Sequence, residues 1–330
     1  MTIGDGVGGV NADVVRLVLD NQIANGAGIT IASSGLLDMN DQIDTTGSIG
    51  GSGRIDLGAG ILEAGADNGS SSFTGLISGT GILFKFGTGA WTLAGNNTYS
   101  GLTTVSAGTL VVNGSQPQSD VTVNGTATLQ GSGVVGDLTV FGSVAPGSSP
   151  GMLTSSNVIF RSSASDYFVE LNGATPGSGY DQLKARGGVT LSNATLHATL
   201  GFQSAISNTF TIIDNDGSDA VTNTFNGLPQ GATLNVSGIP FLISYKGGSG
   251  NDVVLTQLAG LPILTIQRDS TTNVVLSWPT NVTGFDLQFN TNLNNNVWAD
   301  AAPPPTVLGT NNVVTNSIGG ANQFYRLIHP

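Results

Sequence analysis

Cysteine is absent from this 330-residue chain, and charged residues are scarce, with 9 basic and 21 acidic side chains. Without cysteine, neither a disulfide framework nor a thiolate metal site can form. Helical proteins use far more lysine, glutamate and arginine, because these residues favour helices and solvate their outer faces. All but two of the acids are aspartate, which favours turns over helices. These absences predict a chain built from strands and turns.

The chain also lacks features that would recruit nucleic acid or a membrane. Its net charge of −12 would repel a polyanion, and its basic residues are scattered singly. No run of about 18 apolar residues is present, so no transmembrane helix is expected. The first residues, MTIGDGVGG, have neither the basic segment nor the apolar core of a signal peptide. If the protein is exported, its export signal is therefore expected outside this chain.

Glycine, in contrast, is abundant, with 49 residues, and it interrupts a regular alternation of apolar residues. The alternation is clearest in residues 73–114, at Leu76, Ile82, Phe84, Phe86, Trp91 and Leu93. A period of two with glycine punctuation is typical of short, half-buried strands joined by tight turns. Residues 12–19 (ADVVRLVL) form an apolar run whose β-branched valines favour a strand as well.

A short unit recurs along the chain. The valine of a Thr-Val pair stands at Val105, Val123 and Val140, so successive units are 17–18 residues apart. Residues 21–60 read as two further units of about 20 residues. A unit this short buries its apolar face only when it is stacked on its neighbours, at about 4.8 Å per coil. The spacing predicts a parallel β-solenoid, with glycine or asparagine in left-handed backbone conformations at the corners.

Residues 81–114 (GILFKFGTGAWTLAGNNTYSGLTTVSAGTLVVNG) resemble the autotransporter-associated β-strand repeat, also called the passenger-associated transport repeat. The resemblance departs at Leu102, where the family usually has glycine, and at Trp91, where a small residue is commoner. Segments 143–154, 179–196 and 210–256 are similar to those that commonly follow this repeat, so the resemblance covers most of residues 20–257. The matching positions are Gly79, Gly81, Leu83, Lys85, Gly87, Gly89, Leu93, Gly95, Asn96, Asn97, Thr98, Tyr99, Gly101, Thr103, Val105, Gly108, Thr109 and Leu110.

This resemblance implies a right-handed parallel β-helix that lies outside the cell, on a large surface or secreted bacterial protein. It implies no catalytic motif. We therefore expect an all-β chain in which residues 1–258 form the solenoid, with the clearest repeat at 73–114 and a less regular distal part at 152–258.

Residues 262–330 differ in composition, because asparagine rises there and the glycine repeats fade. Apolar residues alternate from Val274 to Trp278 and again from Phe285 to Phe289. Short strands with turn signals over this length predict a small antiparallel β-sandwich. The segment loosely resembles fibronectin type III-like modules, with its last strand, FYRL, closing the core.

Two segments contain candidate calcium ligands. GGSGNDVVL (247–255) fits one copy of the calcium-binding nonapeptide and offers Asp252, but no second copy adjoins it to complete the ligand set. The alternative is a glycine turn that Asp252 caps before the last strand. DNDGSD offers Asp214, Asp216 and Asp219, but it lacks the glutamate and flanking helices of a helix–loop–helix site. A hairpin turn at Asp216–Gly217 is favoured there.

Enzymatic candidates are few. A polysaccharide lyase or glycoside hydrolase would need paired carboxylates, and the candidates are Asp38, Asp41, Asp44, Asp56 and Glu63, with Arg54 the accompanying cation. Solvated turn acids are the favoured interpretation. A Ser-His-Asp triad around His197 would need a nucleophile elbow, and no G-x-S-x-G motif is placed between a strand and a helix. His197 is therefore expected on the outside of a strand. Asn96, Asn97, Tyr99 and Trp91 are expected to hold corners or fill the core, although the aromatic rings could stack on sugars.

The resulting hypothesis is a non-catalytic, extracellular or cell-surface solenoid that acts as a stalk or display surface. Its polar face would make weak, repeated contacts with glycans or other cell-surface components. No cofactor is expected, and the chain is expected to be a monomeric solenoid or part of a larger protein. A β-helical lyase or hydrolase and a calcium-stabilised solenoid remain the alternatives.

Overall fold

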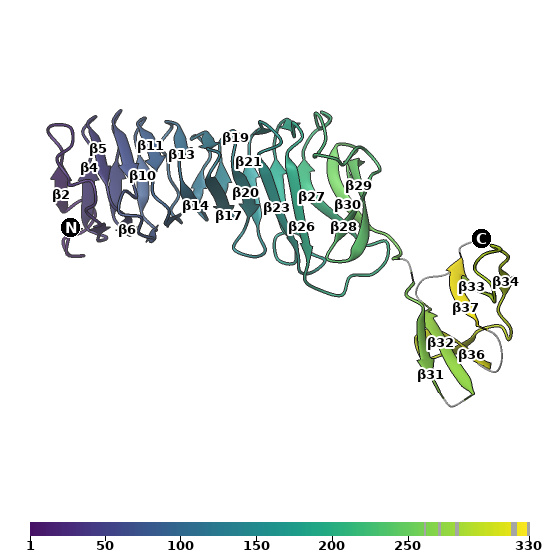
Figure 1. The fold of residues 1–330 in the computed structure, drawn as a ribbon. Helices are drawn as coiled ribbons and strands as arrows, with labels where there is room; N and C mark the ends of the chain where they lie inside the picture. The colour runs from purple at the N-terminus through teal and green to yellow at the C-terminus, as the bar shows by residue number, and fades with distance from the viewer. Residues whose placement is uncertain (261, 270–271, 281–283, 318–321, 329–330) are drawn as a thin grey trace. The chain divides into compact units, whose positions relative to one another are not determined.

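The computed structural model describes residues 1–260, 262–269, 272–280, 284–317 and 322–328. The chain divides into two compact units, Met1–Leu258 and Ala259–Pro330. All the regular structure in the described residues is β-strand, as the composition predicts, and none of them forms a helix able to cross a membrane. Figure 1 labels strands of both units.

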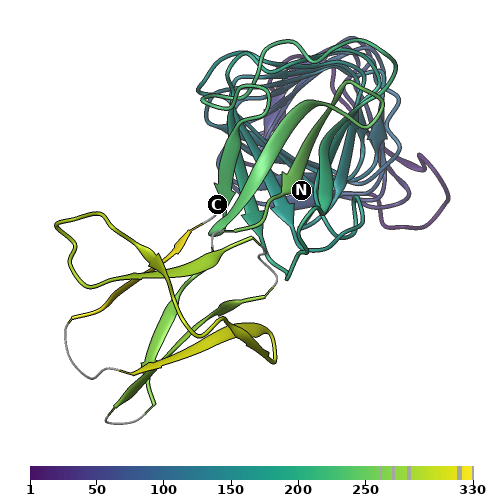
Figure 2. The ribbon, with the colours of Figure 1, turned by 90° about the vertical axis from the view of Figure 1, so that its right-hand side faces the viewer.

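The first unit is a parallel β-solenoid, which confirms the prediction from the 17–18-residue spacing. The coils contribute strands to three sides, and they overlie one another in Figure 2. Sheet A forms the first side, in the order β1 (Thr2–Ile3), β3 (Ile29–Ile31), β6 (Ile49–Gly51), β9 (Ser71–Phe73), β12 (Ala90–Leu93), β14 (Gly108–Val112), β17 (Ala127–Gly131), β20 (Ser143–Pro146), β23 (Asp166–Leu171) and β26 (Thr195–Leu200).

Sheet C forms the second side. Its strands are β5 (Ile43–Thr46), β8 (Ile61–Ala64), β11 (Ile82–Lys85), β13 (Thr103–Val105), β16 (Val121–Val123), β19 (Leu138–Val140), β22 (Val158–Phe160) and β25 (Val189–Thr190). Val105, Val123 and Val140 are paired in register across β13, β16 and β19. All three are fully buried, so the repeating valine is an inward ladder, as its spacing predicts.

The third side is divided into two sheets. Sheet B holds β2 (Asp13–Arg16), β4 (Gly35–Asp38), β7 (Arg54–Asp56) and β10 (Leu76–Ser78), which confirms a strand within residues 12–19. Sheet D continues with β15 (Ser115–Gln116), β18 (Val134–Val135), β21 (Met152–Ser155), β24 (Gln182–Ala185), β27 (Thr209–Asn215), β30 (Asp252–Gln257), β29 (Ile239–Gly247) and β28 (Thr233–Val236).

The distal end of sheet D changes from parallel to antiparallel pairing. β27 pairs with β30, and β29 lies between β30 and β28. The hairpin predicted at Asp216–Gly217 is therefore wrong, because β27 takes its antiparallel partner from residues 252–257, beyond a long connection. The turn between β29 and β30 contains the GGSGND sequence, so the glycine-turn interpretation of that segment is confirmed.

Glycines at one corner of the solenoid stand in a ladder. A Cβ atom added to Gly75 would lie 1.9 Å from the carbonyl oxygen of Gly53, and one on Gly95 would lie 1.8 Å from that of Gly75. The same relation continues at Gly114 and Gly133, at 2.0 and 2.1 Å from the preceding carbonyl. None of these residues has a positive φ. Glycine is required here because the coils approach too closely for a side chain, not for a left-handed backbone.

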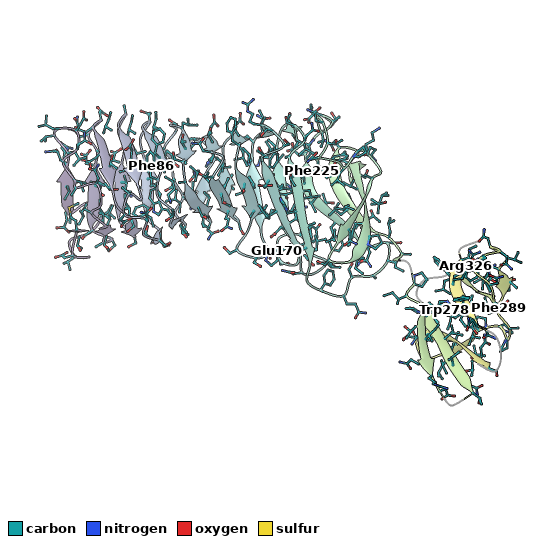
Figure 3. The ribbon with its side chains drawn as sticks, in the orientation of Figure 1. Phe86, Glu170, Phe225, Trp278, Phe289 and Arg326 are labelled. Atoms are coloured by element: carbon teal, nitrogen blue, oxygen red, sulfur yellow. The ribbon has the colours of Figure 1, made fainter. Side chains whose placement is uncertain are left out.

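The second unit contains two antiparallel sheets. One holds β31 (Thr265–Arg268), β32 (Asn273–Pro279), β36 (Asn311–Ser317) and β35 (Thr306–Leu308), and the other holds β34 (Ala299–Asp300), β33 (Asp286–Asn290) and β37 (Phe324–Ile328). Leu276, Trp278 and Val314 of the first sheet pack with Leu287 of the second in a small core. Figure 3 labels Trp278 of this core. β37, the FYRL strand, pairs with β33 and adds Tyr325 and Leu327 to this core.

One buried carboxylate joins three distal segments of the solenoid. Asp181 accepts hydrogen bonds from the backbone N–H groups of Gly151 and Glu170, both at 2.8 Å. Burial raises the pKa of Asp181 to about 6. Because this value exceeds the pKa of an unfolded aspartate, about 3.9, the folded state holds an extra proton between those two pH values. The contribution of the protonated Asp181 carboxyl to the free energy of unfolding is complete below that window and is lost as pH rises through 6.

We expect Gly95→Ala to lower the free energy of unfolding by about 3 kcal/mol or more, because its methyl group would overlap the Gly75 carbonyl. Gly125→Ala is the matched control, since a Cβ at Gly125 meets no atom within 4 Å. Urea unfolding of both variants measures the difference. Equal stability of the two variants would contradict the close approach of the coils.

Asp181→Asn should flatten one part of the pH dependence of stability. As pH falls from 7 to 4, the free energy of unfolding of the parent should rise relative to that of the variant, by on the order of 2 kcal/mol. Urea titrations of both proteins at half-unit pH steps give this difference. Two parallel curves across the window would show that the Asp181 carboxyl titrates normally.

Candidate functional site

The asparagine pair of the repeat replaces a strand on the third side of the solenoid. No strand of sheets B or D lies between β10 and β15, and there Asn96 forms an isolated bridge with Ser115. The side-chain oxygen of Asn97 accepts the backbone N–H of Ile77 at 2.9 Å, and the backbone N–H of Asn97 donates to the carbonyl of Ser115 at 2.7 Å. Asn97 thus joins the preceding coil through its side chain and the following coil through its backbone, which confirms the expected corner role.

Tyr99 is fully buried beside this bridge. Its hydroxyl lies 2.6 Å from that of Thr103, which lies 2.7 Å from that of Ser119, and Ser119 donates to the carbonyl of Gly101 at 2.7 Å. Burial raises the pKa of Tyr99 to about 12, so the phenol remains protonated. The ring is therefore a core residue and does not face a sugar.

Trp91 and Lys85 also form hydrogen bonds with backbone carbonyls inside the solenoid. The indole N–H of Trp91 donates to the carbonyl of Ile49 at 2.8 Å, and the ring is 2% exposed. The ammonium of Lys85 donates to the carbonyls of Phe86, Gly87 and Ala107, at 2.5, 2.9 and 3.2 Å. Burial lowers the pKa of Lys85. The distinctive polar and aromatic residues of the repeat therefore serve the stacking of coils.

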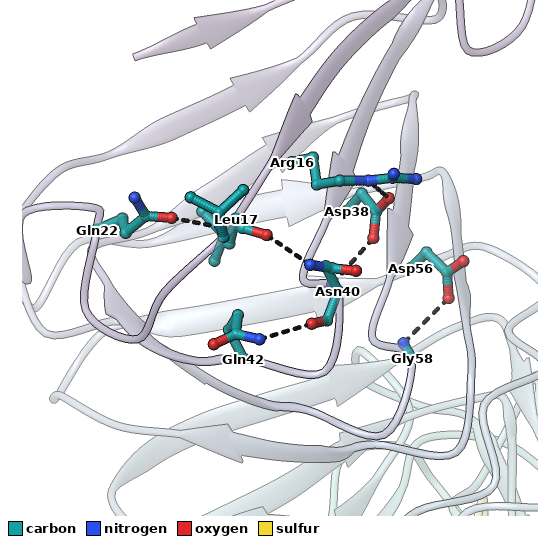
Figure 4. A network of polar contacts seen from close by, with 9 residues as sticks. Arg16, Leu17, Gln22, Asp38, Asn40, Gln42, Asp56 and Gly58 are labelled. Atoms are coloured by element: carbon teal, nitrogen blue, oxygen red, sulfur yellow. Dashed lines mark hydrogen bonds and ion pairs between the residues drawn. The ribbon is translucent and has the colours of Figure 1, made fainter.

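The candidate catalytic acids each hold a turn or a neighbouring coil, and Figure 4 shows this for Asp38 and Asp56. Asp38 pairs with Arg16 at 2.6 Å and accepts the N–H of Asn40, while Asp56 accepts the N–H of Gly58. Asp38 and Asp56 occupy paired positions on adjacent coils. The remaining three have similar roles: Asp44 accepts the N–H groups of Gln22 and Ile23, Asp41 accepts that of Ala59, and Glu63 accepts the hydroxyl of Thr45.

The structure brings the two candidate calcium segments together. Asp252 is buried and accepts the N–H of Asn215 at 2.9 Å, and the side chain of Asn251 donates to the carbonyl of Asp219 at 3.0 Å. Asp214 instead forms an ion pair with Lys184 at 2.8 Å. Within the described ranges, no cluster of three or more His, Asp or Glu residues is arranged to hold a metal ion.

The outer face of sheet C carries two rows of side chains that follow the coils. In the first row, Thr104 pairs with Thr122, and Thr122 with Thr139. In the second row, Ile43 pairs with Ile61, and Ile61 with Ile82. Register places Leu102 after Ile82, and Ile43 and Leu102 are 40% and 41% exposed.

We call Ile43, Ile61, Ile82 and Leu102 the aliphatic row. Phe84 of β11 stands beside it and stacks on Phe86, with ring centroids 5.8 Å apart. The face expected to be polar is thus partly apolar, and contiguous exposed apolar surface marks interaction sites. The alternation of apolar residues over 82–86 indicated apolar side chains on one face of this strand. Only the strand register shows that residues about 20 positions apart form one row.

His197 lies on the outside of β26, as expected. Its Nε2 atom is 2.8 Å from Asp166, and its ring stacks on Phe168, with centroids 4.5 Å apart. A cleft of about 630 Å³ adjoins this pair at the last coil. No sequence pattern indicated this cleft. The lining includes Phe168, Glu170, His197, Asn226, Leu228 and Leu234.

Comparisons with known proteins agree with the repeat. The Passenger-associated-transport-repeat family model matches residues 83–112. Over 114 residues, or 31% of the chain, the sequence is 40% identical to "Adhesin BmaC autotransporter" of Brucella suis biovar 1 (strain 1330). Over 197 residues, or 56% of the chain, it is 34% identical to "Extracellular serine protease" of Serratia marcescens.

These two matches cover 3% and 17% of the relatives' own lengths, so the chain spans a small part of each. The family model does not reach residues 262–330, and the fibronectin type III-like character of that unit stays a prediction.

Asp252→Ala should lower the melting temperature by a similar amount with and without calcium, because the carboxylate's partners are backbone N–H groups. Loss of these buried hydrogen bonds should cost roughly 1–3 kcal/mol. Asp214→Ala, which removes an exposed ion pair, is the control and should cost at most about 1 kcal/mol. Thermal unfolding in millimolar calcium and in chelator tests this. If calcium raises the melting temperature of the parent and Asp252→Ala abolishes this rise, the calcium-stabilised alternative is supported instead.

Proposed function

Because residues 83–112 are a passenger-associated transport repeat, we propose that this solenoid is part of an extracellular or cell-surface passenger and acts as a stalk and display surface. The observation that carries the proposal is the internal use of the repeat's polar residues. Asn97 and Lys85 bind neighbouring coils directly, and the buried Tyr99 hydroxyl reaches the next coil through Thr103 and Ser119. The repeat therefore builds length and leaves its flat outer faces for contact.

The proposed role is adhesive. The relative from Brucella suis carries the name adhesin, and the part it shares with this chain is 40% identical. The aliphatic row and the adjacent threonine row offer apolar and hydroxyl groups that repeat at the coil spacing, about 4.8 Å. Each contact with a glycan or another cell-surface component would be weak, and repetition along the face would raise the overall avidity.

Catalysis forms no part of this proposal. The acids that a β-helical lyase or hydrolase would need are hydrogen-bonded to turns and neighbouring coils, as described for Asp38, Asp44 and Glu63. The relative named as a serine protease shares 17% of its length with this chain, so its activity does not transfer.

The double variant Ile61→Thr/Ile82→Thr tests the proposed contact face. Both side chains are partly exposed, so stability should change by at most about 1 kcal/mol. We expect beads coated with the variant to be retained several-fold less well than parent-coated beads on cultured epithelial cells and on glycan arrays. Val111→Thr also replaces an aliphatic side chain by threonine, but on the outer face of sheet A, and is the control. Undiminished retention of the double variant would show that the aliphatic row is not the contact face.

A further inference from the structure

The last strand of sheet A has a free edge. Among the strands that the structure describes, β26 pairs with β23 alone. The N–H of Thr195 donates to Ser165, and that of Gly201 donates to Leu171, at 2.9 and 2.8 Å, so the odd-numbered residues of β26 face β23. Because backbone groups alternate along a strand, the N–H and C=O groups of Leu196 and Ala198 point away from it.

Both ends of this free edge are closed by other residues. The carbonyl of Ala194 accepts the N–H of Asn226 at 2.9 Å, and the N–H of Leu200 donates to the hydroxyl of Ser237 at 3.0 Å. Between them, no hydrogen bond joins the outward groups of Leu196 and Ala198 to any described residue. Exposed strand edges of this kind template the addition of another strand.

The unpaired groups open into the cleft of about 630 Å³, a volume typical of ligand sites. Leu228 and Leu234 form part of its apolar wall, and Leu234 belongs to β28, the terminal strand of sheet D. Glu170 lines the cleft. Asp166 lies beside the cleft, where its carboxylate contacts His197, another lining residue. The cleft therefore combines a strand edge, an apolar wall and acidic side chains.

We propose that this cleft binds a short extended peptide, which adds to sheet A as a strand next to β26. Main-chain hydrogen bonds to Leu196 and Ala198 would provide affinity, and alternate side chains would provide specificity. Apolar residues would face Leu228 and Leu234, and basic residues would face the acidic side. The outward backbone groups recur every two residues, about 6.6 Å apart, as the groups of an added strand do. This site is separate from the aliphatic row and does not depend on the adhesive proposal.

The probe is a fluorescent peptide of sequence Lys-Val-Lys-Val-Lys, acetylated and amidated, titrated into the full chain. Two derivatives carry N-methyl groups, one on both valine amides and one on the last two lysine amides. In an extended strand these two sets of N–H groups point to opposite edges. We expect one derivative to bind about tenfold or more weakly than the parent peptide and the other to bind like it, since one lost hydrogen bond is worth up to about 1.5 kcal/mol.

Ala198→Pro provides the matched change in the protein. It removes the outward N–H and no hydrogen bond to β23, and edge strands accept proline at such positions. Ala198→Ser keeps the N–H and is the control. Peptide binding should be lost in the proline variant and kept in the serine variant. In the parent, hydrogen exchange of the Leu196 and Ala198 amides should slow when the peptide is added.

Three results would overturn the proposal. The first is equal binding of the two N-methyl derivatives, or no binding of the parent peptide. The second is binding of a neutral oligosaccharide such as maltohexaose that Ala198→Pro leaves unchanged, in place of peptide binding. The third is self-association of the parent that Ala198→Pro abolishes, which would make a second copy of this chain the occupant.

Discussion

The close stacking of coils at the glycine corner is the constraint on which the solenoid depends. The backbone of each coil passes so near the carbonyl oxygens of the previous coil that a single Cβ atom at Gly75 or Gly95 would overlap them. Over the coils where this contact repeats, from Gly53 to Gly133, the parallel ladders keep one register from coil to coil. The inward valine ladder through Val105, Val123 and Val140 and the outward rows of sheet C both follow from that register.

The same constraint explains why conspicuous side chains are not free for chemistry. The backbone of a solenoid corner leaves polar groups that need partners, and an unpaired buried group is costly. Lys85 supplies donors to three carbonyls, and Asn97 replaces the backbone of a missing strand. In the first coils, the carboxylates of Asp38 and Asp44 accept backbone N–H groups. These polar side chains thus satisfy backbone groups of the coils, which is consistent with a structural role for the repeat.

The regular stack ends where sheet D becomes antiparallel, and there the surface changes character. Sheet D continues through β27, β30, β29 and β28, whereas sheet A stops at β26. One side is therefore extended while its neighbour has an open edge. The cleft beside Leu196 and Ala198 results from this mismatch, because a regular coil would have placed the next strand against that edge.

The sequence by itself determined the local and periodic features. Period-two alternation predicted the strands, the 17–18-residue spacing predicted which valines form a ladder, and the repeat motif placed the asparagine corner. These features depend on residues that are close together in the sequence or recur at a fixed separation. They can therefore be predicted from the amino-acid sequence alone. Only the tertiary structure decided the rest. The reason for glycine at Gly95 is a neighbouring coil, the aliphatic row joins Ile43 to Leu102 through register, and β27 pairs with residues about 45 positions away rather than in the predicted hairpin. Pairings and close approaches of this kind depend on which backbones meet in space, and no local pattern encodes that.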